Sequence, residues 1–179
     1  MPRVFLLVLA AVQGLAAAAV AGPAGWEVYR APAGWSISYP AGWEVAGSGP
    51  AAAFLAPPVR VSGASFRPSL VVSVSRVDRG TPAERVVEVA RAAFERATPG
   101  VRLLGQETVQ AASDQISVLY YHFPPDRGMP GLYFVLGVAV RDQLYVMLGT
   151  TSTALQDYRQ QAAVFRAMMA SLRVARVAR

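Results

Sequence analysis

The chain has 179 residues, with 54% hydrophobic and 16% charged residues, no cysteine and a formal net charge of +6. The length suits one domain of about 100–200 residues, and the apolar content excludes an intrinsically disordered chain. Without cysteine the protein has no disulfide, no thiol nucleophile and no cysteine-ligated metal.

The positive charge comes from arginine alone. The sequence has 17 basic residues against 11 acidic ones, and it contains neither lysine nor asparagine. Isoleucine occurs only at Ile37 and Ile116. Since the codons of lysine, asparagine and isoleucine are AT-rich, a GC-rich genome explains this pattern without selection for binding. The arginines are scattered rather than clustered, so the charge does not predict nucleic acid as a partner.

The N-terminal residues have the pattern of a secretory signal peptide. Arg3 precedes an apolar run that ends in small residues at Ala19-Val20-Ala21. A basic start, an apolar middle and an A-x-A end are typical of an export signal. A glutamine, a glycine and a string of alanines make the run weaker than a membrane span. We therefore expect residues 1–21 to be a signal peptide and residues 22–179 to form one exported domain, periplasmic or extracellular. A retained membrane anchor is the alternative.

The tetrapeptide PAGW occurs three times near the N-terminus and contains every tryptophan of the chain. Its copies begin at Pro23, Pro32 and Pro40, and Pro-Gly turn signals favour turns that lead into short strands. After the second copy, apolar residues alternate with serine from Trp35 to Tyr39, which is the pattern of a half-buried strand. We expect the tryptophans to close one end of the core. A stacking platform for a sugar or lipid is the alternative.

The middle of the chain predicts a loop, a strand and a helix. Residues 46–68 are rich in glycine, proline, alanine and serine and are expected to form a loop-rich connection that holds a minor strand, whereas residues 69–77 alternate as a strand does. In the helix that follows, Thr81 is a suitable N-cap, Pro82 suits the first turn and Glu84 completes a capping box. Pro99-Gly100 ends this helix. Its apolar stripe consists of Ala83, Val86, Val87, Ala90 and Phe94.

Four strands and a second helix complete the chain. The strands are expected at residues 101–111, 115–123, 132–140 and 144–151. The third is apolar on both faces, which predicts a central strand covered on both sides, and it forms a hairpin with the fourth. The helix is expected at residues 154–172, with Thr153 and Gln156 as a second capping box and with Met168 and Met169 filling the core.

The order of these elements indicates the fold class. Consecutive strands joined by short turns predict an antiparallel sheet, and two helices with apolar stripes predict packing against that sheet. We therefore expect a single α+β domain, with an antiparallel sheet of about six strands flanked by helices.

Parts of the sequence resemble the PsbP-like family, which is grouped with the Ran-binding protein Mog1. The first match is GWSISYPAGW at residues 34–43, where an aromatic residue, an alternating strand, Tyr-Pro and a tryptophan follow one another. The second is LYVML at residues 144–148, which leads through Thr151 to a helix closing in Ser171-Leu172-Arg173. The family has phenylalanine where this chain has Leu172. The resemblance covers residues 29–174, nearly all of the expected domain.

The resemblance implies an antiparallel sheet flanked by helices and a non-catalytic role. Plant and cyanobacterial members are extrinsic subunits of photosystem II, associated with calcium and chloride retention, and other bacterial members are exported or lipid-anchored envelope proteins. No metal-binding or docking residue of the photosystem subunit matches this chain, so none is transferred to it.

The sequence contains no established motif for catalysis, metal binding or nucleotide binding. It has no G-x-S-x-G elbow, no Walker loop, no G-x-G-x-x-G and no D-x-D-x-D-G calcium loop. His122 is the only histidine, which excludes a histidine-cluster metal site and leaves one candidate general base. Asp126 lies four residues further on, but a lone histidine at a strand end is typical of a structural residue. We therefore expect no enzymatic activity, no cofactor and no metal.

Two segments are candidates for contact with a partner. The loop at residues 123–131 is long for a hairpin and carries Asp126 and Arg127, and long loops on rigid sheets often bind ligands or proteins. Residues 173–179 place arginine at every third position, which suits peripheral contact with anionic lipid or an acidic protein. A disordered connector and a solvated chain end are the alternatives.

The sequence favours an exported, non-catalytic accessory or interaction module of the bacterial envelope that binds an envelope protein. The alternative is a carrier of a small ligand or lipid, with a pocket between sheet and helices lined by Trp35, Trp43 and Tyr158. An open cavity there favours the carrier, whereas a packed core beside an exposed apolar patch favours the interaction module. A hydrolase is the third hypothesis and requires a serine and an acid beside His122. The candidate contact residues are Trp35, Trp43, His122, Asp126, Arg127 and Tyr158; the oligomeric state is not predicted.

Overall fold

The computed structural model describes residues 24–47, 50–78, 80–111, 115–126, 130–141 and 143–174. The expected signal peptide at residues 1–21, the candidate contact residue Arg127 and the last five residues of the arginine-rich C-terminus lie outside the described residues. The predictions made for them therefore stay predictions.

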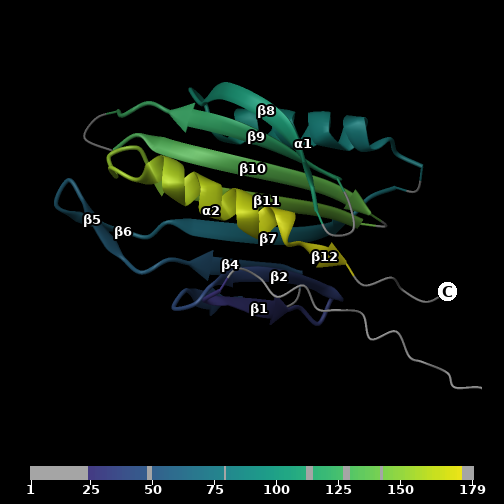
Figure 1. Cartoon of the computed structure of the whole chain (residues 1–179). Helices are drawn as coiled ribbons and strands as arrows, with labels where there is room; N and C mark the ends of the chain where they lie inside the picture. The colour runs from purple at the N-terminus through teal and green to yellow at the C-terminus, as the bar shows by residue number, and fades with distance from the viewer. Residues whose placement is uncertain are drawn as a thin grey trace, which may run out of the picture.

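A seven-stranded antiparallel sheet forms the centre of the molecule (Figure 1). All of its neighbouring strands pair antiparallel, as the short connections predict. In spatial order the strands are β3 (Glu44–Ala46), β4 (Ala51–Leu55), β7 (Ser69–Arg76), β11 (Gln143–Ser152), β10 (Leu132–Arg141), β9 (Gln115–Phe123) and β8 (Arg102–Gln110).

Two smaller sheets accompany the large one. The first has the order β1 (Trp26–Arg30), β2 (Trp35–Pro40) and β12 (Arg173–Val174), and the second is a hairpin of β5 (Val59–Val61) and β6 (Ala64–Phe66). The described residues therefore hold more strands than the expected six. Three strands that the sequence does not signal, β5, β6 and β12, are two or three residues long, which is too short for a pattern of period two to be recognised.

The PAGW repeats are turns that introduce strands, as expected. The glycines of the three copies, Gly25, Gly34 and Gly42, have φ angles of +82°, +84° and +82°. Glycine adopts this left-handed conformation without the steric cost that a Cβ brings. A strand begins at the last residue of the first two copies, Trp26 and Trp35, and directly after the third copy at Glu44. The repeat is therefore a recurring turn and not a unit of a repeat protein.

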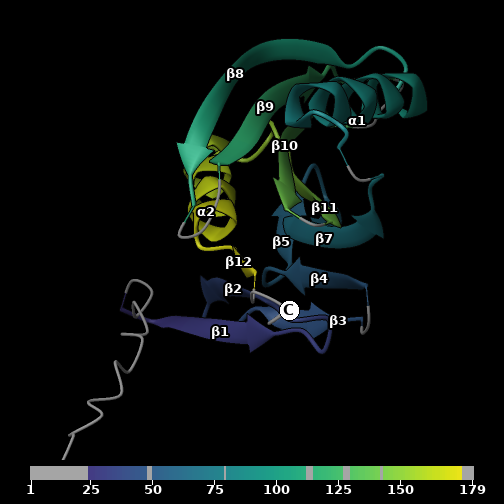
Figure 2. The same cartoon turned by 90° about the vertical axis from the view of Figure 1, so that its right-hand side faces the viewer.

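The two helices lie on opposite faces of the large sheet. Figure 2 shows the sheet curving around α2 (Tyr158–Ala170), while α1 (Ala83–Ala97) lies on its outer side. On the α2 side, the core joins the large sheet to β2 through Trp35, Ile37 and Tyr39. Among the described residues, neither helix is long and apolar enough to cross a membrane.

Strand β10 is covered on both faces, as its sequence, which is apolar on both faces, predicts. Phe134, Leu136 and Val138 belong to the cluster beneath α1, and Val135 and Ala139 belong to the core beneath α2. Met168 and Met169 are both fully buried in that second core, which confirms them as core residues.

The prediction of a capping box at the start of each helix is wrong. Helix α1 begins at Ala83 with Pro82 in the N-cap position, and no side chain caps it. Helix α2 begins at Tyr158, four residues later than expected, and Asp157 at its N-cap makes no capping hydrogen bond. Before α2, Leu155 donates to the carbonyl of Ser152, and Tyr158 donates to that of Leu155. These successive turns occupy the residues that the sequence assigned to the first helical turn.

Candidate functional site

The predicted contact residues are distributed over different parts of the molecule. Trp35 is 2% exposed and packs against Tyr29, with ring centroids 5.4 Å apart. Trp43 is partly buried and meets the ring of Phe165 edge-on at 6.2 Å. Tyr158 lies at the start of α2 with its ring 5.4 Å from that of Tyr133. The tryptophans are therefore part of the packed core, and the three side chains pack against different rings.

Among the described residues, no hydrogen bond or ion pair joins His122 to Asp126. His122 is half-buried near the end of β9, and its cross-strand neighbours are Arg102 and Tyr133. Neither neighbour is a serine or an acid, and Asp126 is exposed beyond the strand. Within the described ranges, no three acidic or histidine side chains come together as metal ligands do.

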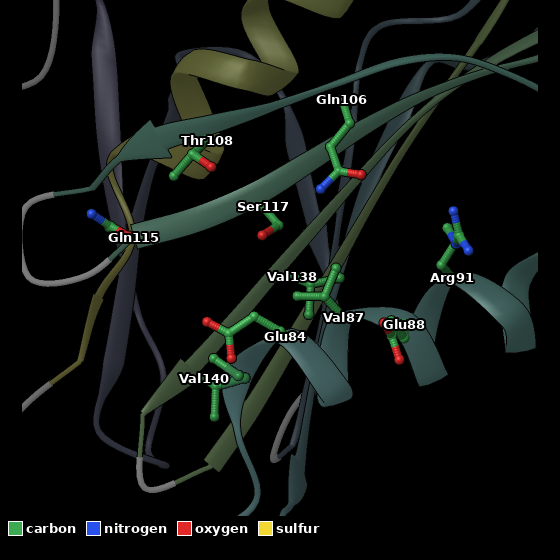
Figure 3. A pocket seen from close by; sticks show the side chains of 11 residues that line it. Glu84, Val87, Glu88, Arg91, Gln106, Thr108, Gln115, Ser117, Val138 and Val140 are labelled. Carbon is green, nitrogen blue, oxygen red and sulfur yellow. The ribbon is translucent and has the colours of Figure 1, made fainter.

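Helix α1 lies between two hollows. On its β8 side is a cleft of about 550 Å³ with a mixed polar and apolar lining. Figure 3 shows Glu84, Val87 and Glu88 of α1 on one side of this cleft and side chains of three strands on the other. The cleft is lined by Ala83, Glu84, Val87, Glu88, Arg91, Gln106, Thr108, Gln115, Ser117, Val138 and Val140.

On the β7 side of α1 is an open, predominantly apolar groove of about 750 Å³, which we call the α1 groove. Its charged residues are Arg76, Asp78 and Arg85. The complete lining is Val71, Ser73, Arg76, Val77, Asp78, Thr81, Arg85, Val86, Val89, Ala90, Ala93, Phe94, Ala97, Leu136, Leu144, Val146 and Leu148.

The α1 groove stays open because the helix covers only part of its face of the sheet. Val86 is the only buried residue described for α1, and Phe94 anchors the helix through ring contacts with Tyr121 at 4.9 Å and Phe134 at 5.4 Å. The sheet continues past the helix towards β7. There Val71 remains 37% exposed, and Val89 on the helix is 52% exposed.

Sequence reasoning missed the α1 groove, although a signal for it was present. Val86, Val89, Ala93 and Ala97 are spaced as a second apolar line along the helix. The apolar stripe that includes Val86 and Phe94 is sufficient to pack the helix on the sheet, so the sequence predicts no packing partner for Val89. When the apolar arc of a helix is wider than packing on one sheet requires, the excess indicates an additional apolar neighbour.

Comparisons with known proteins identify the fold. No protein-family model and no curated protein matches this sequence. Among solved structures, the solution structure of cyanobacterial PsbP from Synechocystis has a TM-score of 0.56, at 17% identity over 90% of this chain and 99% of that one. The Ran-binding protein Mog1p of Saccharomyces cerevisiae has a TM-score of 0.57, at 10% identity over 83% of this chain and 95% of that one. The chain has the Mog1/PsbP fold.

A third similar structure is a protein of unknown function from Pseudomonas aeruginosa, with a TM-score of 0.54 and 19% identity over 80% of this chain and 94% of that one. At these identities the likeness shows the Mog1/PsbP fold alone. It confirms the expected α+β class, and the fold implied by the sequence resemblance, but it assigns no site to this chain.

On the α2 face of the Mog1/PsbP fold, Glu107 connects the outer strand β8 to the helix. Its carboxylate accepts hydrogen bonds from Arg166 Nε at 2.7 Å and Arg166 Nη2 at 3.1 Å, and from the Tyr120 hydroxyl at 2.5 Å. The Arg166 and Tyr120 hydrogen bonds lower the pKa of Glu107 below 4.5. Burial, assisted by the hydrogen bond to Glu107, raises the pKa of Tyr120 to about 12.

We expect Glu107→Gln to destabilise the protein by about 1 kcal/mol or less at pH 7, because the bonded groups remain partly exposed. Since the folded state lowers the pKa of Glu107, its stabilisation is present above pH 4.5 and is lost as the pH falls through the folded pKa. Urea unfolding of both proteins between pH 2 and 7 tests this. The difference in unfolding free energy should shrink at acid pH, and a difference independent of pH would contradict the assignment.

Proposed function

We propose that this protein is an exported, non-catalytic accessory module that binds a protein partner of the bacterial envelope through the α1 groove. The α1 groove itself carries the proposal. Exposed apolar surface rimmed by polar residues is typical of interaction sites, whereas the α2 side chains Phe165, Met168 and Met169 on the opposite face are fully buried. The export signal expected at residues 1–21 supports the location.

An amphipathic helix of the partner is the occupant that the α1 groove fits best. The groove has α1 on one side and strands β7, β10 and β11 as its floor. Helices bind such grooves with apolar residues spaced three and four apart. Two arginines and one aspartate at the rim favour acidic over basic flanking residues on the partner. The solved protein named Ran-binding, which has the same fold, is by its name a binder of another protein.

Glutamate in place of Val71 or Val89 tests the proposal. Both side chains are exposed, so neither substitution opens a cavity, but each would put an unpaired carboxylate into the apolar interface. We expect each variant to weaken partner binding at least tenfold. Val28→Glu is the matched control, because Val28 is 46% exposed on β1 in the small sheet.

The absence of cysteine allows a direct location of the interface. A single cysteine introduced at position 89, or at position 28 as control, carries a photo-crosslinker into an envelope extract. One partner protein crosslinked from position 89 and competed by unlabelled wild type supports the proposal. Equal crosslinking from both positions, or partner binding unaffected by Val71→Glu and Val89→Glu, would contradict it.

A carrier of a lipid or small apolar ligand is the second candidate, favoured by the volume of the α1 groove. About 750 Å³ falls within the roughly 300–1,000 Å³ of typical ligand pockets. A lipid that co-purifies with wild type and is lost from Val89→Glu, in the absence of any crosslinked protein, would favour the carrier.

A further inference from the structure

A further pocket lies on the α2 face, on the other side of the sheet from the α1 groove and independent of the proposed function. It has a volume of about 300 Å³ and is lined by Tyr120, Tyr133, Arg159, Ala162, Ala163 and Arg166. We call it the tyrosine–arginine pocket.

The sequence of α2 creates this pocket. Arg159 and Arg166 are seven residues apart and therefore lie on the same side of the helix, about 10 Å apart along its axis. Ala162 and Ala163 between them have only methyl side chains, which leaves space above the strands. The opposite wall is formed by two rings, because Tyr120 of β9 and Tyr133 of β10 have centroids 6.3 Å apart.

Arg166 is paired with a carboxylate, whereas in the described part of the chain Arg159 is not. Arg166 donates two hydrogen bonds to the carboxylate of Glu107, at 2.7 and 3.1 Å, so that its charge is neutralised. Arg159 donates through Nε to the hydroxyl of Tyr158 at 3.1 Å, and its guanidinium carbon lies 5.7 Å from the Tyr158 ring centroid. No carboxylate among the described residues pairs with Arg159. The pocket therefore has one uncompensated positive charge, held in position by a ring.

Tyr133 adds a neutral hydrogen-bond donor. Its hydroxyl has no hydrogen-bond partner among the described residues, and burial raises the pKa of this phenol, so it remains protonated at neutral pH. Its ring is fixed between those of Tyr120 and Tyr158. Next to it on β11, the fully buried hydroxyl of Thr151 also lacks a partner within the described residues.

We propose that the tyrosine–arginine pocket binds a small aromatic carboxylate. A guanidinium matches the planar geometry of a carboxylate, and the Tyr133 hydroxyl supplies a further donor. The tyrosine rings and alanine methyl groups offer apolar contact to a ring, and aromatic side chains interact favourably with rings at 4.5–7 Å centroid distances. One uncompensated arginine matches a single negative charge. A volume of about 300 Å³ corresponds to the smallest of typical ligand pockets.

Titration calorimetry of the purified chain with benzoate tests the proposal, with acetate as the anion without a ring and benzyl alcohol as the ring without a charge. We expect benzoate to bind at least tenfold more tightly than either. Arg159→Gln and Tyr133→Phe should each weaken benzoate binding, Arg159→Gln by at least tenfold. Arg60→Gln, on the β5–β6 hairpin, is the matched control and should bind as wild type does.

The outcomes separate clearly. Since Arg159 is exposed, its substitution should leave thermal unfolding unchanged, so that lost binding reports the site. Equal affinity for acetate and benzoate would overturn the proposal, as would binding that Arg159→Gln leaves unchanged or the absence of benzoate binding at millimolar concentration.

Discussion

Replacing Phe165 by alanine is expected to cost about 3–5 kcal/mol of unfolding free energy, the range for a fully buried phenylalanine. The side chain is 0% exposed. It meets Trp43 edge-on with centroids 6.2 Å apart and an interplanar angle of 80°, and it covers the backbone of Gly149 on β11. Phe165 therefore connects α2, the large sheet and the third PAGW turn, and its removal leaves a cavity between all three.

Urea denaturation of wild type and Phe165→Ala measures this effect. Phe94→Ala on α1 is the matched control, because Phe94 is only half-buried beside the α1 groove. We expect it to cost roughly 1–2 kcal/mol, since less apolar area returns to water. Equal costs for the two variants would contradict the contrast between a closed core beneath α2 and an open groove beside α1.

Gly149→Ala is expected to destabilise the protein by about 1–3 kcal/mol, the range for overpacking in a filled core. A Cβ at this position would lie 2.6 Å from Cδ2 and Cγ of Phe165 and 3.0 Å from its Cβ. The ring has no room to move away, because it is buried and packs against Trp43. This clash outweighs the roughly 0.5–1 kcal/mol that alanine normally gains over glycine in a strand.

Gly137→Ala on the neighbouring strand is the control. Its Cβ would lie 2.7 Å from Sδ of Met169 and 3.2 Å from Cε of Met147. Methionine side chains are flexible and adapt to a new neighbour, so we expect a cost below about 1 kcal/mol. A double-mutant cycle of Gly149→Ala with Phe165→Leu should give a favourable coupling. Additive costs would show that the clash with Phe165 is not the cause.

Local sequence signals predicted the elements that are long and regular. The patterns correctly placed the alternating strands β2 and β7 and the strand β10, which is apolar on both faces. They also placed the end of α1 near Pro99. Both helix starts were displaced, because the turns that precede each helix use the same polar residue types as a cap. The shortest strands carry no pattern and were not expected individually.

The candidate sites were less accessible to sequence reasoning. Trp35 and Trp43 belong to the core, as the simpler interpretation expected, whereas Tyr158 lies with Tyr133 beside the tyrosine–arginine pocket. The residues of that pocket come from β9, β10 and α2, and Glu107 joins from β8. No spacing in the sequence predicts such a set of residues, because strand register and helix placement bring its members together.

The sequence alone determined the α+β class, the antiparallel pairing, the turn positions and the apolar residues that form the core. Periodicity and turn chemistry are properties of consecutive residues, so they can be recognised without the fold. Only the tertiary structure decided where α1 lies across the sheet, and thereby which apolar residues remain uncovered in the α1 groove. It also decided which arginine of α2 meets a carboxylate, because Glu107 and Arg166 are 59 residues apart in the chain and adjacent only after folding.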